Sequence, residues 1–131
     1  ADYQQTLADY AAWRAQQANA AVQAKLDRAM DETGRLADRV TSDPDYLSGF
    51  AAGVGAMRSV DLSRCEDLMG RDFDSLQRQP PQVPASTGDR QQRYAQGFQD
   101  GQRLLFGLES LRGLPRCFVT VPASQRAAQG Q

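Results

Sequence analysis

The sequence predicts an all-α single domain with one disulfide, in which a long N-terminal helix packs on a duplicated pair of glycine- and aromatic-rich helices. Three observations lead to this prediction. One short pattern occurs twice, and apolar residues recur at intervals of three and four over most of the chain. Alanine and glutamine are abundant whereas β-branched residues are few, which favours helix over strand. A chain of 131 residues can form one domain with a modest core.

The repeated pattern has the spacing Y-x2-G-F-x2-G and is followed further along by L-x-R-C. A glycine inside a helix costs about 1 kcal/mol relative to alanine, so close backbone contact must offset this cost. We therefore expect the two helices to face each other across an approximate two-fold axis. The predicted helix-packing groove consists of Tyr46, Gly49, Phe50, Gly53, Tyr94, Gly97, Phe98 and Gly101.

The first predicted element is a helix over residues 1–41. At about 1.5 Å per residue, its apolar pattern over residues 3–40 alone would extend about 57 Å, which exceeds the width of a domain of this size. It should either bend, near Gly34, or project and contact another chain. Packing on its own domain and association with a partner, including a homodimer, both fit the pattern. The residues assigned to partner binding are Tyr3, Leu7, Tyr10 and Trp13.

Residues 42–77 form the first predicted repeat. Ser42 or Asp43 can cap a second helix, and Pro44 suits its first turn. Residues 61–77 predict a third, shorter helix or a pair of turns, with Gly70 as a break.

Residues 78–89 are rich in proline and form a predicted connector without helix. Residues 90–122 form the second predicted repeat. Its helix should open with a capping box of Asp89 and Gln92 and end at Gly113, where glycine permits a reversal of the chain.

The last part of the chain has two predicted features. Residues 117–121 have the only strand-like composition and should form an extended segment. Residues 123–131 are small and polar and form a predicted flexible tail.

The two cysteines, Cys65 and Cys117, predict either a disulfide or two buried thiols. A disulfide between them would remove about 4 kcal/mol of unfolded-state entropy and would imply an oxidising compartment, periplasmic or extracellular. A start at Ala1 fits a mature product after removal of an export signal. A trimmed chain or loss of an initiator methionine fits equally.

The sequence lacks the residues that several kinds of function require. The chain has no histidine, the usual general base and the commonest zinc ligand, so we expect neither an enzyme nor a metal or cofactor site. A net charge of −1 gives no general attraction for nucleic acid. No apolar run is long enough to predict a membrane span.

One segment resembles a known family. Its G-F-x2-G helix, followed by Cys117 and a proline five residues later, is similar to small periplasmic immunity proteins that neutralise secreted cell-wall amidases. The resemblance covers about a quarter of the chain, and it transfers no binding residue because the family's helices after the cysteine are missing here. We expect a non-catalytic exported protein that binds another protein, as an inhibitor, an immunity factor or an accessory subunit of an envelope assembly. The alternatives are a structural subunit that self-assembles through its first helix and a small carrier of an apolar ligand.

Overall fold

The computed structural model describes residues 2–77, 80 and 88–121, and the regular structure in this part of the chain is entirely helical. It therefore confirms the predicted all-α class. Most of the predicted connector and the whole predicted tail lie outside the described residues. The elements are α1 (Asp2–Arg39), α2 (Pro44–Arg58), α3 (Cys65–Gly70), the 3-10 turn η1 (Phe73–Ser75), α4 (Asp89–Gly113) and the 3-10 turn η2 (Leu114–Cys117).

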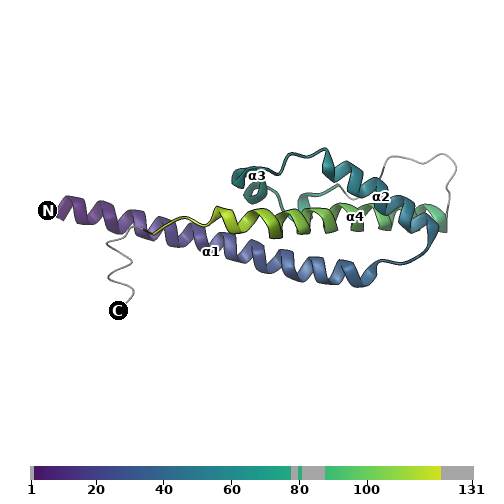
Figure 1. The fold of residues 1–131 in the computed structure, drawn as a ribbon, viewed down its shortest axis with the longest axis horizontal. Coiled ribbons are helices and arrows are strands. Elements are labelled where there is room, and N and C mark those ends of the chain that lie inside the picture. Colours follow the sequence, from purple (N-terminus) through teal and green to yellow (C-terminus); the bar gives the residue numbers. More distant parts are fainter. Residues whose placement is uncertain (1, 78–79, 81–87, 122–131) are drawn as a thin grey trace.

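Helix α4 is the centre of the fold, with α1 packed along one side and α2 along another (Figure 1). α1 runs antiparallel to α4. α2 runs parallel to α4, because Gly49 meets Tyr94 and, one turn later, Gly53 meets Phe98. No helix in the described part is both long and apolar enough to cross a membrane.

The contact between α2 and α4 is made by backbone. A β-carbon on Gly49 would overlap the carbonyl oxygen of Tyr94, and one on Gly97 would overlap the carbonyl oxygen of Tyr46. The same exchange recurs one turn later, where Gly53 meets the carbonyl of Phe98 and Gly101 meets that of Phe50. The contacts are thus reciprocal, and each glycine α-carbon is placed for a weak Cα–H···O contact with the facing helix.

Local signals explain where α2 and α4 begin. The Asp43 carboxylate accepts a hydrogen bond from the Tyr46 amide at 2.9 Å, and Pro44 occupies the first turn, as predicted. α4 differs from the prediction. Its cap is Gly88, whose positive φ of 59° is a conformation that glycine readily adopts. Asp89 is already the first helical residue, so the expected capping box is wrong.

Three other expectations need correction. α1 continues unbroken past Gly34, which is exposed and has open space beside it. Gly113 keeps right-handed helical angles and leads into η2 without a reversal. Pro115 fits there because the first turn of a helix does not need its missing N–H group. Cys117 belongs to this turn, Phe118 has extended backbone angles, and residues 118–121 form no strand in the described structure.

Two small apolar clusters join the elements. Val22, Leu68 and Leu114 form the first, and Cys117 packs against it. Met57, Phe73 and Phe106 form the second, in which the two phenylalanine rings meet edge to face with centroids 5.0 Å apart. The Cys65–Cys117 disulfide, with α-carbons 5.6 Å apart, links the start of α3 to the end of η2. Of the two states predicted for the cysteines, the disulfide is therefore the one present.

The glycine contact can be tested by a matched pair of substitutions in α2. Gly53→Ala places a methyl group against the Phe98 carbonyl, so we expect it to lower the free energy of unfolding by about 3 kcal/mol. Gly55→Ala, two residues away, meets open space and should raise it by about 0.5–1 kcal/mol. Urea unfolding followed by circular dichroism measures both, and similar effects of the two changes would contradict the close approach.

The disulfide can be tested by its removal. The double change Cys65→Ala and Cys117→Ala should lower the free energy of unfolding by about 2–5 kcal/mol, because the unfolded chain gains freedom. Intact mass spectrometry of the natural chain should show alkylation only after reduction. Alkylation of both cysteines before reduction would contradict the bond.

Candidate protein-binding surface

The second half of α1 is fixed to α4 by a buried stripe. Val22, Ala29 and Leu36 are buried and spaced by seven, so they lie on one side of the helix. Beside them, the Thr33 hydroxyl fills the space that a side chain at Gly107 of α4 would need. This packing sets the direction of the whole helix.

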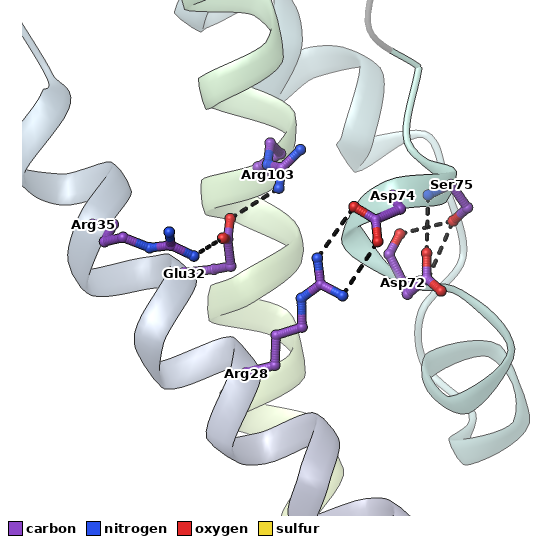
Figure 2. Close-up of polar contacts among 7 residues, drawn as sticks. All are labelled: Arg28, Glu32, Arg35, Asp72, Asp74, Ser75 and Arg103. Atoms are coloured by element: carbon purple, nitrogen blue, oxygen red, sulfur yellow. Dashed lines mark hydrogen bonds and ion pairs between the residues drawn. The ribbon is translucent and has the colours of Figure 1, made fainter.

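A buried carboxylate of α1 adds a polar contact to this stripe. Glu32 is buried between α1 and α4, and the Arg103 guanidinium of α4 donates to it at 3.0 Å. Arg35, one turn further along α1, pairs with the same carboxylate from the solvent side (Figure 2). A buried carboxylate needs such partners, because an unpaired buried charge is strongly destabilising.

A buried carboxylate of α4 faces an arginine of α1, the reverse of the Glu32 contact. Asp100 is only 1% exposed and accepts hydrogen bonds from the Tyr46 hydroxyl at 2.6 Å and from the Gln96 amide at 2.9 Å. The Arg39 guanidinium of α1 lies 3.7 Å from it. Burial, together with the Asp100 carboxylate, raises the pKa of the Tyr46 hydroxyl above its usual range. Each of the two helices therefore contributes a buried carboxylate that faces an arginine of the other.

Further side chains of α1 contact the segments that follow α2 and α4. Burial lowers the pKa of Lys25, whose ammonium group donates to two backbone carbonyls. Arg28 reaches η1 and pairs with an aspartate there (Figure 2). The contacts are Lys25 to the carbonyls of Arg71 at 2.6 Å and Leu68 at 3.5 Å, Arg28 to Asp74 at 3.2 Å, and Asn19 to both the N–H and the C=O of Val119 at 2.7 and 2.9 Å.

The first half of α1 continues as a rod beyond the ends of α2 and α4 (Figure 1). It carries a row of exposed side chains that we call the aromatic face: Tyr3 (74% exposed), Leu7 (51%), Tyr10 (57%) and Trp13 (56%). Successive residues are rotated by about 100° around the helix axis, and this rotation places the row on a different side of the helix from the buried stripe. Ala12 and Ala15, which continue the stripe, are buried.

Two members of the aromatic face are already in contact. The Tyr10 and Trp13 rings are stacked with centroids 6.2 Å apart, and the Arg14 guanidinium lies 5.9 Å from the centre of the Tyr10 ring. The two rings therefore contact each other on the helix surface without a partner, and such a contact reduces the entropy that binding must remove.

The residues of the predicted helix-packing groove lie in the interior. Tyr46, Phe98 and the four pattern glycines are buried, while Phe50 and Tyr94 are half-buried. The facing helix occupies both glycine edges, so no open groove remains between them for an apolar ligand. These residues hold the fold together and do not form a surface.

Sequence reasoning missed the polar residues between α1 and α4. Glu32 and Asp100 look like ordinary surface acids. Glu32 lies one turn from Ala29 and from Leu36, which was the only available signal, whereas Asp100 lies about 200° around α4 from Phe98. No group of three His, Cys, Asp or Glu side chains in the described residues is placed to hold a metal ion.

Comparison with protein-family models, with curated proteins and with solved structures finds no match to this chain.

The contribution of the buried ion pair can be measured with two arginine variants. Arg103→Met breaks a pair in which both side chains are largely buried, at 15% and 9% exposure, so the loss of stability should be about 3 kcal/mol. Arg35→Met removes a partner of the same carboxylate that is 72% exposed, and should cost less than about 1 kcal/mol. Thermal or urea unfolding compares them, and an equal cost would show that Glu32 does not depend on Arg103.

Proposed function

We propose that this is a non-catalytic exported protein that binds another protein through the aromatic face of α1. The observation that carries the proposal is the projecting, exposed row of Tyr3, Leu7, Tyr10 and Trp13. Large aromatic side chains dominate the energy of protein interfaces, and contiguous exposed apolar residues often mark such interfaces. Export is supported by the disulfide, because disulfides persist mainly in oxidising compartments.

The mode of recognition follows from the helix. Residues 3, 7 and 10 recur at intervals of four and three, the spacing by which an amphipathic helix inserts one side into a groove. The rest of α1 is anchored to α4, so the helix can present this side without a folding step. The partner should therefore offer an apolar groove, as the target of an inhibitor or immunity factor or a neighbouring subunit of an envelope assembly would.

Self-assembly through the same helix is a second candidate, favoured by the order of charges in α1. In an antiparallel pair of α1 helices centred near residue 8, Asp2 of one chain faces Arg14 of the other, and Tyr3 faces Trp13. A two-fold contact of this kind would be self-complementary. The carrier alternative receives no comparable support, because the glycine edges are filled.

The repeated glycine pattern also bears on how the α2–α4 pair arose. We infer that the segments around Gly49 and Gly97 are two copies of one helical unit, and the reciprocal contacts of their glycines with each other's carbonyls support this. A unit that pairs with its own copy would provide a stable base for an added N-terminal helix.

The binding surface can be tested by photo-crosslinking in the cells that make the protein. A photoreactive benzoylphenylalanine at Tyr10 should give one discrete crosslinked product with another protein. The same group at Met30, which is exposed on the anchored half of α1, is the matched control and should give none.

The result separates the candidates. A product of twice the chain mass would replace the partner hypothesis with self-assembly, and sedimentation over a hundredfold concentration range should then show mass rising with concentration. Equal crosslinking at Tyr10 and Met30, or none at either, would contradict the aromatic face as an interface.

A further inference from the structure

A second surface feature lies away from α1. It is a cleft of about 810 Å³ between the end of α2 with the loop that follows it and the C-terminal half of α4 with η2. None of its lining residues belongs to α1, so it is separate from the aromatic face. Its volume falls within the range of about 300–1,000 Å³ that is usual for ligand sites.

Three arginines line this cleft: Arg58, Arg112 and Arg116. The guanidinium groups of Arg58 and Arg116 have no ion-pair or hydrogen-bond partner among the described residues. The closest carboxylate oxygen to Arg112, on Glu109 one turn earlier, is 3.7 Å away. The Arg116 guanidinium lies over Gly113, 3.7 Å from the position of a β-carbon there, which places it against the wall of the cleft.

The acidic residues of the cleft do not satisfy these arginines. The Asp61 carboxylate accepts hydrogen bonds from both the amide and the hydroxyl of Ser63, at 3.0 and 2.7 Å. These bonds lower the pKa of the Asp61 carboxyl and use part of its capacity to accept hydrogen bonds. Glu109 alone cannot pair with three guanidinium groups. The cleft therefore has unused capacity to bind an anion.

Apolar side chains lie beside the arginines. Met57 is buried at the end of α2, and two half-buried leucines line the cleft, Leu62 from the loop after α2 and Leu105 from α4. A ligand that carries an apolar group next to its anionic group would contact both kinds of surface. A simple inorganic anion would use only the arginines.

The helix ends oppose negative charge at the cleft, and they oppose a double charge more than a single one. α2 ends at Arg58 and α4 ends at Gly113, so the carbonyl ends of both helices lie at the cleft. Each carries a partial negative charge that opposes a doubly charged phosphate more than a singly charged carboxylate. The guanidinium fork binds a carboxylate with two parallel hydrogen bonds.

We propose that this cleft binds the C-terminal carboxylate of a peptide whose last side chains are apolar. Arg58 and Arg116 hold the carboxylate, and Leu62 and Leu105 contact the apolar side chain. Arg112 adds charge at the rim. The site would let the protein hold a chain end of a second protein independently of α1.

The test uses the full chain, labelled with nitrogen-15 and titrated with the peptide acetyl-Ala-Leu-Leu bearing a free carboxylate. Chemical shifts should move in residues 57–63 and 105–116. The same peptide with a C-terminal carboxamide should bind about tenfold or more weakly, because the charge-assisted hydrogen bonds are lost.

Variants and a second probe complete the test. Arg58→Gln and Arg116→Gln should each weaken binding about fivefold or more, while Arg71→Gln, an exposed arginine outside this cleft, should leave it unchanged. The amide spectra confirm that each variant is folded. Equal binding of the carboxamide peptide, shifts that avoid the cleft, no binding at about 10 mM peptide, or tighter binding of phenyl phosphate than of the peptide would overturn the proposal.

Discussion

The direct contact of two helix backbones at α2 and α4 is the interaction on which the rest of the structure depends. Four glycines replace the usual layer of side chains, and each meets a carbonyl of the facing helix. Without this layer the helix axes can approach closely, so dispersion contacts between backbone atoms substitute for a larger apolar core. In a chain with only modest apolar content, these contacts add to the two small apolar clusters.

The close pair then determines where the other elements lie. Because α2 and α4 are parallel and in register, Tyr46 reaches the carboxylate of Asp100 on the facing helix. That carboxylate in turn faces Arg39 of α1, so the helix pair and the long helix share one polar contact. At the other end of α4 the disulfide keeps η2 beside α3, and Asn19 of α1 binds the backbone just beyond it. The second half of α1 is held at both ends, and this leaves the first half as a stiff projection.

Much of this could be predicted from local sequence, and the exceptions have physical reasons. The glycine and aromatic spacing was a strong signal because glycine inside a helix is unfavourable unless something approaches it. The cap of α2 followed from Asp43 and Pro44 for similarly local reasons. The start of α4 did not, because Asp89 has a side chain suited to capping, whereas the cap is the preceding Gly88, which has none. The continuity of α1 past Gly34 depends on its packing against α4, which no local pattern reveals.

The surface features were likewise predictable only where they depend on local sequence and not on the packing of separate helices. The aromatic face was predictable because its four residues share one helix and one side. The arginine cleft was not, because Arg58, Arg112 and Arg116 come together only once α2 and α4 are paired. Glu32 and Asp100 were missed because their burial depends on arginines from another helix.

The most direct test of the central claim is a proton NMR measurement of distances across the helix pair. If the backbones touch, nuclear Overhauser effects should connect the α-protons of Gly53 with the amide proton of Gln102, and those of Gly97 with the amide proton of Phe50. Observation of both effects is the result that this account predicts. Their absence in a folded sample, with α2 and α4 both helical, would show that side chains separate the two helices and would contradict it.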